Sequence, residues 1–261
     1  MTMPIESPLL LRSEDERGVT TLTLNRPSAF NALSEAMLSA LQTELDDLGK
    51  SSKLRVLVIA AAGKAFCAGH DLREMRAEPS MDYYKKLFDQ CGRMMMSIQK
   101  LQVPVIAKVQ GIATAAGCQL VAQCDLAVAS SDSKFAVSGV NLGLFCSTPS
   151  VALSRNLSRK AAFEMLVTGD FLNAQEALSK GLINKVAEPD ELDAVLEALV
   201  VKILAKPPVA LAMGKELFYM QLETGIEKAY EYAVQTMACN MMDNSALEGV
   251  QAFIEKRKPH W

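Results

Sequence analysis

The side chains most able to do chemistry in this chain are two histidines and six cysteines. His70 and His260 lie far apart in the sequence, and no two cysteines have the Cys-x-x-Cys spacing that is typical of metal sites. The sequence therefore predicts no metal site. We interpret the chain as intracellular, so we expect no disulfides and read most thiols as small buried hydrophobic groups. The cysteines are Cys67, Cys91, Cys118, Cys124, Cys146 and Cys239.

Cys146 and Ser147 are the candidate nucleophiles. A nucleophilic thiol or hydroxyl needs an adjacent base, and no second histidine lies near these positions in the sequence. Cysteine and serine at the junction of a loop and a helix more often pack against the helix or cap it. Covalent catalysis is therefore the less favoured interpretation.

A run of small residues is the other chemical feature of the sequence. Residues 111–117 are mostly glycine and alanine, and an apolar turn of helix follows at residues 118–122. Such a run is expected where a backbone must approach a ligand or another backbone closely. The run alone does not say which of the two it approaches.

The charge of the chain excludes broad classes of partner. With 27 basic and 30 acidic residues, the formal net charge is −3. No global field attracts a nucleic acid or an anionic membrane, so neither is expected as a partner. Any anionic ligand must be held by local groups.

The elements that must position these residues alternate along the first two thirds of the chain. Residues 19–24, 54–60, 103–109 and 125–129 have the apolar, β-branched pattern of strands. Residues 35–48 and 84–101 carry helical stripes, the first after a plausible N-cap at Ser34 and before a stop at Gly49. This alternation predicts an α/β fold with helices covering the strands.

The last part of the chain has a different pattern. Helical stripes cover residues 192–204, 209–219, 226–241 and 246–256, with breaks at Pro207, Pro208 and Gly225. We divide the chain into a core of residues 1–197 and a helical C-terminal region of residues 198–261.

The N-terminal decapeptide lacks a basic segment followed by an apolar run, and polar residues interrupt the long apolar stretches. We therefore expect no export signal and no membrane span. The expected compartment is the cytoplasm, or the mitochondrial matrix if a transit peptide precedes this sequence.

Five segments in a fixed order resemble the crotonase (enoyl-CoA hydratase/isomerase) superfamily over nearly the whole chain. Each segment alone is a weak signal, and the order makes the resemblance strong. Residues 113–122 and 139–149 further resemble one subgroup of that family. The segments are residues 25–33, residues 64–72, residues 109–125, residues 168–182 and residues 248–257.

The resemblance implies a fold and a ligand. The fold is a spiral of ββα units with a C-terminal helical trimerisation region, assembling as a homotrimer or hexamer. The ligand is a coenzyme A thioester, a substrate rather than a cofactor, and no cofactor is implied. The family's oxyanion hole, carried onto this sequence, consists of the backbone N–H groups of His70 and Ala116.

Such a hole would stabilise the negative oxygen of a thioester enolate, as backbone donors can do without titrating. The alternative is that residues 113–117 only allow close packing of helix on strand. The His70 side chain is an alternative acid or base, although its backbone N–H is the preferred role.

The acid and base positions depart from the family's pattern. The two glutamates of family hydratases fall on Gln119 and Gly139, and the aspartate of dienoyl isomerases falls on Ser147. An amide has no useful pKa for acid–base catalysis, and glycine has no side chain. Ordinary hydration is therefore not expected.

Further residues are expected to bind the substrate. Arg26, Lys64 and the basic cluster of residues 256–258 are candidates for the phosphates of coenzyme A, the cluster from a neighbouring subunit. Asp71 and Asp125 are expected to accept hydrogen bonds from turns. The remaining candidates for substrate binding are Phe66, Cys67, Ala68, Asp71, Leu72, Asn141 and Cys146.

Three functions remain open at this point. The first is an enzyme that forms a thioester enolate without a protein base, for example by decarboxylation of a malonyl-type thioester. The second is a non-catalytic acyl-CoA-binding protein that kept the ligand site. The third, a purely structural oligomer, is disfavoured because both loops of the expected oxyanion hole are intact.

Overall fold

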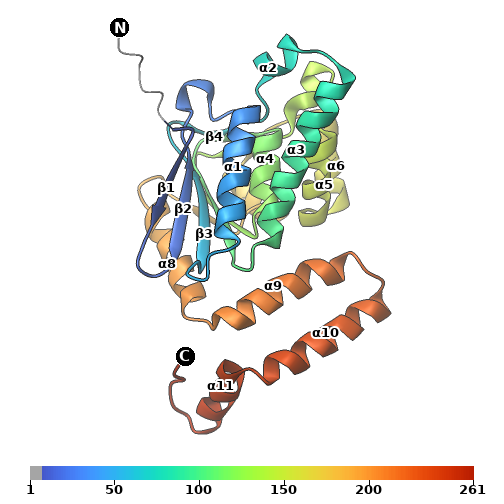
Figure 1. Cartoon of the computed structure of the whole chain (residues 1–261). Helices are drawn as coiled ribbons and strands as arrows, with labels where there is room; N and C mark the ends of the chain where they lie inside the picture. Colours follow the sequence, from blue (N-terminus) through green and yellow to red (C-terminus); the bar gives the residue numbers. More distant parts are fainter. Residues whose placement is uncertain (1–7) are drawn as a thin grey trace.

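A six-stranded sheet forms the centre of the molecule in a computed structural model, which describes residues 8–261 (Figure 1). The first strand is antiparallel to the second, and the other neighbours in the sheet are parallel. In sheet order the strands are β1 (Leu10–Glu14), β2 (Val19–Leu24), β3 (Val56–Ala61), β5 (Val105–Val109), β7 (Leu126–Ser130) and β10 (Lys185–Ala187).

Both faces of this sheet are covered, which explains the continuous apolar run of β3. Leu57 and Ile59 pack in the large core cluster with α1 (Glu35–Leu48) and α3 (Met81–Lys100). Val56 and Val58 point to the other face and pack in a second cluster with α8 (Leu192–Leu204). Alternate side chains of a strand point to opposite faces, so a strand covered on both sides must be apolar throughout.

The helix boundaries follow local capping signals. Ser34 caps α1, its hydroxyl accepting a hydrogen bond from the Met37 N–H at 3.1 Å, and Gly49 ends the helix, as predicted. Ser80 caps α3 in the same way, with the Tyr83 N–H as donor at 3.2 Å. Figure 1 shows α1, α3 and α4 (Ala116–Gln123) side by side in front of the sheet.

A smaller four-stranded sheet continues the spiral. Its strands in order are β4 (Ala65–Cys67), β6 (Ile112–Thr114), β8 (Lys134–Ala136) and β9 (Leu172–Asn173), the last antiparallel to the third. A helix follows each of them in the chain: α2 (Leu72–Ala77) comes after β4, α4 after β6, the short helix η2 (Ser138–Leu142) after β8, and α7 (Ala174–Lys180) after β9. The α/β fold with a helical C-terminal region confirms the expected fold class.

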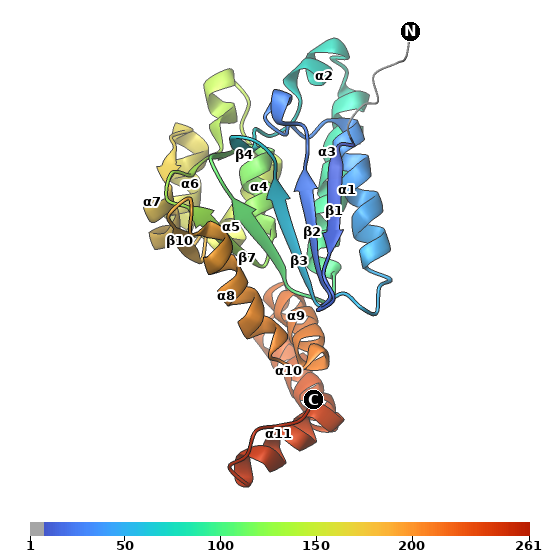
Figure 2. The same cartoon turned by 90° about the vertical axis from the view of Figure 1, so that its left-hand side faces the viewer.

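The helical C-terminal region leaves the core after α8, in which the expected boundary at residue 197 lies. Figures 1 and 2 show α9 to α11 as an arm extending from one end of the sheet. The remaining helices are η1 (Pro27–Ala29), α5 (Ser147–Asn156), α6 (Arg159–Thr168), α9 (Pro208–Leu222), α10 (Ile226–Met241) and α11 (Asn244–Ile254).

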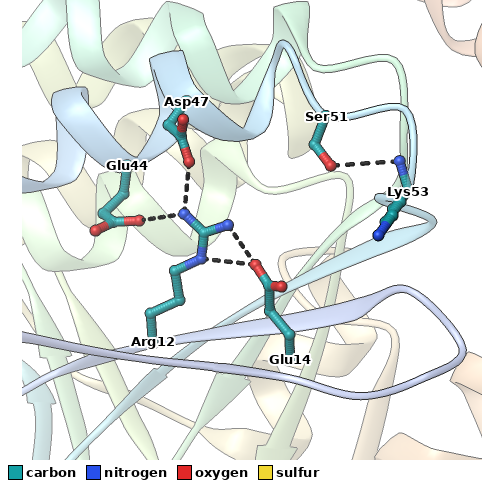
Figure 3. A network of polar contacts seen from close by, with 6 residues as sticks. All are labelled: Arg12, Glu14, Glu44, Asp47, Ser51 and Lys53. Carbon is teal, nitrogen blue, oxygen red and sulfur yellow. Dashed lines mark hydrogen bonds and ion pairs between the residues drawn. The ribbon is translucent and has the colours of Figure 1, made fainter.

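The outer strand β1 is tied to α1 by charged groups. The Arg12 guanidinium donates to Asp47 at 2.7 Å and to Glu44 at 3.0 Å, and it also pairs with Glu14 on its own strand (Figure 3). These three carboxylates raise the pKa of Arg12. The contact fixes an edge strand to the helix that covers it.

The structure describes only part of the N-terminal segment. Residues 1–7 lie outside the described part of the chain, and with them most of the segment on which the expected lack of an export signal rests. Within residues 8–261, no helix combines the length and the apolar composition needed to cross a bilayer.

Candidate functional site

The loop that carries His70 connects β4 to α2 and is fixed by backbone hydrogen bonds. The Leu33 N–H donates to the Gly69 carbonyl at 2.7 Å, and the Ala68 N–H donates to the Phe30 carbonyl at 3.0 Å. Gly69 has a φ of 93°, a conformation that favours glycine. The His70 backbone is therefore held in place by the turn that follows β2.

The junction of β6 and α4 carries the second predicted donor. Ala116 is the first residue of α4, so its N–H has no partner inside the helix. Ala115, just before it, has a φ of 50° and donates its own N–H to the Ala136 carbonyl at 2.9 Å. A non-glycine residue in this region is strained by about 1–3 kcal/mol and persists only where its surroundings impose it.

These two junctions touch each other because β4 and β6 are parallel neighbours. A Cβ built on Gly69 would lie 3.2 Å from the Ala116 nitrogen, and one on Gly117 would lie 2.1 Å from the Cys67 carbonyl oxygen. Glycine at both positions lets the backbones approach. The small-residue run thus serves close packing, and it also brings His70 and Ala116 to one place.

Both residues line a single cavity of about 320 Å³, here called the His70 cavity. It lies between α2, α3, the start of α4 and the segment from η2 to α5. Most of its wall is apolar, and its lining includes no lysine, arginine, aspartate or glutamate. The lining residues are Ala68, His70, Leu72, Met75, Phe88, Ala115, Ala116, Ser138, Gly139, Leu142, Leu144, Phe145, Cys146, Ser147, Thr148 and Pro149.

The His70 imidazole is a polar group without a partner in this apolar wall. Neither ring nitrogen is hydrogen-bonded within the described structure, and the ring contacts Phe88 edge-on, with 5.4 Å between ring centroids. Burial lowers the pKa of His70, and the neighbouring Leu33 backbone only partly opposes this. The imidazole is therefore neutral at pH 7 and has an N–H to offer to a ligand.

Gly139, the position of the second family glutamate, is closed by the segment that follows it. A Cβ on this residue would lie 2.5 Å from the Leu144 carbonyl oxygen and 2.7 Å from the Cys146 Sγ. Atoms at these distances overlap, so the backbone as folded has no room for a side chain at residue 139. The backbone path of residues 139–146 therefore excludes a glutamate at residue 139.

Gln119, the position of the first family glutamate, lies one helical turn after Ala116 on α4. Its side chain is 4% exposed, and its Oε1 has no hydrogen-bond partner among the described residues. Residues three apart share a helix face, so the Gln119 side chain lies on the same face of α4 as that of Ala116, but Gln119 is not among the residues that line the His70 cavity. It can accept or donate a hydrogen bond, but it cannot transfer a proton as a carboxylate does.

Arg26 and Asp71 pair with each other behind the His70 loop. The Arg26 Nη1 lies 2.7 Å from the Asp71 Oδ2, while Asp71 caps α2 by accepting from the Arg73 and Glu74 N–H groups. Burial raises the pKa of Asp71, but these hydrogen bonds outweigh it and the net pKa is lowered. Asp71 has the expected role of stabilising a turn. The Arg26 charge is paired with Asp71 within the protein, whereas it was predicted to bind a phosphate of coenzyme A.

The other predicted binding residues are spread over different environments. The Lys64 ammonium lies 5.3 Å from the centre of the Phe30 ring on the surface. The Phe66 and Cys67 side chains are fully buried in the core, so only their backbones could meet a ligand. Asn141 donates to the Gly169 carbonyl at 3.5 Å, outside the cavity lining.

The basic cluster of residues 256–258 lies beyond α11, at the end of the arm that extends away from α2 and α4 (Figure 1). Arg257 pairs there with Glu248 and Glu255. The cluster does not reach the His70 cavity of its own chain, so its predicted role depends on a neighbouring subunit.

Several lining residues were not predicted from the sequence. Leu142, Leu144 and Phe145 form an apolar loop with exposed fractions of 69%, 47% and 44%. Three large apolar side chains in a loop were a signal that could have been used. Met75 and Phe88 lie on helices, where nothing in the pattern separates a cavity wall from a core.

No group of three or more histidine, cysteine, aspartate or glutamate side chains in residues 8–261 is arranged to hold a metal ion.

Comparisons with known proteins identify relatives over the full described length. The model of the enoyl-CoA hydratase/isomerase family matches residues 14–261. A protein of Rattus norvegicus is 44% identical over 258 residues, covering 99% of this chain and 86% of the relative. A protein of Homo sapiens is 46% identical over 244 residues, covering 94% and 80%. Both are named enoyl-CoA hydratase domain-containing protein 3, mitochondrial, which is the subgroup that residues 113–122 and 139–149 resemble.

Solved structures agree with this. An enoyl-CoA hydratase of Mycobacterium smegmatis is 66% identical with a TM-score of 0.96, and the match covers 98% of this chain and 99% of that one. The human domain-containing protein 3 is 44% identical with a TM-score of 0.93, covering 97% and 100%. The predicted resemblance to the crotonase superfamily, and to this subgroup, is confirmed.

Proposed function

The chain belongs to the enoyl-CoA hydratase/isomerase family, and from this membership we propose that it binds an acyl-CoA thioester with the acyl group in the His70 cavity. The thioester oxygen accepts hydrogen bonds from the backbone N–H groups of His70 and Ala116. The observation that carries this proposal is that both residues line one cavity, at junctions whose backbones touch. Their role as an oxyanion hole is supported by this placement.

The chemistry follows from where charge develops. Any reaction that passes through a thioester enolate places a negative charge on the carbonyl oxygen. Two fixed N–H groups in a cavity with a mostly apolar wall stabilise that charge, and Ala116 lies at the N-terminus of α4, where the helix dipole favours negative charge. Losing one such donor typically costs about 2.7–4 kcal/mol of transition-state stabilisation.

The reaction must manage without a carboxylate from the protein. Neither Gln119 nor Gly139 can act as a base, and no acidic side chain lines the cavity. Decarboxylation of a malonyl-type thioester needs no base, because the bond to the carboxylate breaks, carbon dioxide leaves, and the electron pair forms the enolate. A wall without lysine or arginine leaves that carboxylate unpaired, which favours its loss over its burial.

The absence of both acid–base groups also favours a second function. A protein without either acid–base group can bind an acyl-CoA and turn nothing over, as a carrier or an assembly partner. This non-catalytic function predicts binding of CoA esters with no reaction of any of them.

The test is to incubate the purified protein with malonyl-CoA, methylmalonyl-CoA and crotonyl-CoA, and to measure binding by calorimetry. We expect binding of the esters, loss of carbon dioxide from a malonyl-type ester, and no hydration of crotonyl-CoA at typical enzyme rates of about 10 s⁻¹. Efficient hydration would overturn the argument from Gln119 and Gly139. Binding without turnover of any ester would leave the non-catalytic function.

Two matched variants at residue 116 differ in whether the backbone N–H is present. Ala116→Pro removes the N–H at the first position of α4, where proline is tolerated by helices, and Ala116→Gly keeps it. We expect about a 10²- to 10³-fold loss of turnover in the proline variant only. Thermal unfolding of both variants checks that α4 remains folded.

We also propose that copies of the chain assemble through the arm of α9 to α11, as a trimer or a hexamer. No apolar residue of α9 or α10 is buried in the single chain. Such an apolar surface is typical of an interface between subunits.

For the compartment, two findings point in different directions. The rat and human relatives are named as mitochondrial, whereas the 66% identical protein comes from a bacterium, which has no mitochondria. We propose the cytoplasm, with the mitochondrial matrix as the alternative.

A further inference from the structure

The Cys146 thiol occupies the space into which a side chain at residue 139 would extend. Its Sγ lies 2.7 Å from the position of a Cβ on Gly139, and the residue lines the His70 cavity. In the family's pattern this is where the second glutamate begins. The thiol therefore lies where the side chain of the family's second glutamate would start. It also lies in the wall of the cavity in which we propose that the acyl group binds.

The cavity offers few other protons. Of its lining residues, only His70 and Cys146 have ordinary titratable side chains. The hydroxyl of Ser138 is shared with Thr114 at 3.0 Å, and that of Ser147 lies 3.3 Å from the Phe145 carbonyl. These two hydroxyls already have partners inside the protein, and Thr148 has the third hydroxyl of the lining.

The surroundings of the Cys146 thiol favour its protonated form, but they also contain groups that stabilise the thiolate. Burial raises the pKa of Cys146, so the neutral thiol predominates at pH 7. The Gly139 backbone hydrogen-bonds to the sulfur and partly opposes this rise. Cys146 is also the N-cap residue of α5, and the N-terminus of a ten-residue helix favours a negative charge.

We propose that Cys146 takes the place of the second family glutamate, with its thiol beside the α-carbon of the bound acyl group, and donates the proton that converts the enolate into product. This inference rests on the proposed enolate function and adds the proton donor to it. His70, with its unpartnered ring nitrogens, is the competing donor in the same cavity.

The step balances without a further reactant. The Sγ–H bond breaks, and the enolate's electron pair forms the new bond between the α-carbon and that proton. The carbonyl double bond is restored, and the negative charge moves from the thioester oxygen to Sγ. Water then returns a proton to the thiolate and leaves hydroxide, which the released carbon dioxide takes up as bicarbonate, so no oxidant or reductant is needed.

The position of the thiol can be tested with a reactive substrate analogue. In 2-bromobutyryl-CoA the α-carbon carries bromide, which a neighbouring thiol displaces while losing its proton. Cys239 of α10, which is exposed in the single chain and lies outside the His70 cavity, is the control thiol, and its labelling by iodoacetamide reports its accessibility in the assembled protein. Peptide mass spectrometry compares labelling of the two cysteines by this analogue and by iodoacetamide.

We expect the analogue to favour Cys146 over Cys239 by roughly 10²-fold more than iodoacetamide does, because binding brings the reacting atoms together. Unreactive butyryl-CoA should protect Cys146 and leave Cys239 unaffected. If the analogue binds competitively but modifies Cys146 no faster than iodoacetamide does, the proposed position is wrong. If no CoA ester binds, the proposed function itself is wrong.

The donor role is tested by turnover of a methylmalonyl-type ester in deuterated water. The wild type should place deuterium on one face of the α-carbon. Cys146→Ala should lose about 10²- to 10⁴-fold in rate and give mixed stereochemistry, and Cys146→Ser, which keeps a proton-bearing group, should recover part of both.

An Ala variant with the wild-type rate and stereochemistry overturns the donor role while leaving the proposed function intact. Absence of turnover in the wild type, with ester binding retained, overturns both together. Equal thermal unfolding midpoints for the three proteins exclude misfolding as the cause of a loss.

Discussion

At the scale of single residues, the site is defined by one position that has no room for a side chain and one position whose backbone is strained. The backbone around Gly139 has no room for a side chain, and Ala115 is held at a positive φ just before the predicted donor Ala116. Asn31 supports the same region from behind. Its buried amide accepts from the Arg26 N–H at 2.8 Å and donates to the Ala62 and Ala65 carbonyls. Local contacts of this kind fix the donors before any ligand arrives.

The pH dependence of stability is a prediction at this scale. Because the folded-state pKa of His70 is below its ordinary value of 6.5, the unfolded chain binds more protons at acidic pH. The stability contributed by neutral His70 is full above pH 6.5 and is lost as the pH falls below it, by up to about 1.4 kcal/mol per unit of pKa shift.

The measurement is urea unfolding at pH 7.5 and pH 5.5 for the wild type and for His70→Gln. We expect a smaller loss of stability on acidification in the variant, since every other group is common to both proteins. An equal loss in the two proteins would show that His70 is not buried as a neutral group.

At the scale of elements, α9 is attached to the core by one buried polar cluster. Asp125, at the junction of α4 and β7, accepts from the Val105 N–H, from Lys215 of α9 and from the Tyr219 hydroxyl, each at 2.6 Å. Lys215 also donates to the Ile98 carbonyl at 3.0 Å, and only 7% of its side chain is exposed. The cluster joins the start of the arm to the sheet and to α3.

Removing the cation should therefore be costly. Burial lowers the pKa of Lys215, and the neighbouring Asp125 carboxylate partly opposes this decrease. Each of the two buried charges is therefore stabilised by the other. Lys215→Met leaves the Asp125 charge without its cation, and we expect a loss of about 3–5 kcal/mol in the free energy of unfolding.

The control is Lys86→Met on α3, which breaks an exposed pair with Glu35 of α1 and should cost about 0–1 kcal/mol. Urea unfolding of both variants gives the comparison. Similar losses in the two variants would contradict the role of the cluster.

At the scale of the whole molecule, the arm presents more apolar surface than a lone chain can hide. Large apolar side chains are exposed along all three of its helices, in contrast to the packed helices α1 and α3 of the core. Exposed apolar surface is unfavourable in water and is stabilised by association. The most exposed of them are Ile226, Tyr230, Val234, Met237, Met242, Phe253 and Ile254.

We expect the full chain to sediment as a trimer or a hexamer. Val234→Asp, at a residue with 67% exposure on α10, should shift the equilibrium toward monomers because it places a charge in the apolar interface. Leu11→Asp, at a residue with 44% exposure on β1, is the control and should leave assembly unchanged. A wild type that remains monomeric at all concentrations would contradict the proposed assembly.

The sequence by itself determined the elements and the order of the motifs. Helix α1 begins after Ser34 and ends before Gly49 as predicted, and residues 19–24 form β2, because caps, stops and side-chain periodicity act within a few residues. The resemblance to the family assigned the two backbone donors to His70 and Ala116, and from this a shared site was predicted. The family likeness rests on the same local segments.

Only the tertiary structure decided what surrounds these residues. Arg26 pairs with Asp71 across 45 positions, Lys215 reaches Asp125 across 90, and the Leu144 carbonyl with the Cys146 thiol fills the space beside Gly139. Such contacts depend on how strands and helices pack in three dimensions, and no local pattern encodes them. The sequence could show that a glutamate is missing at residue 139, whereas the fold shows what stands in its place.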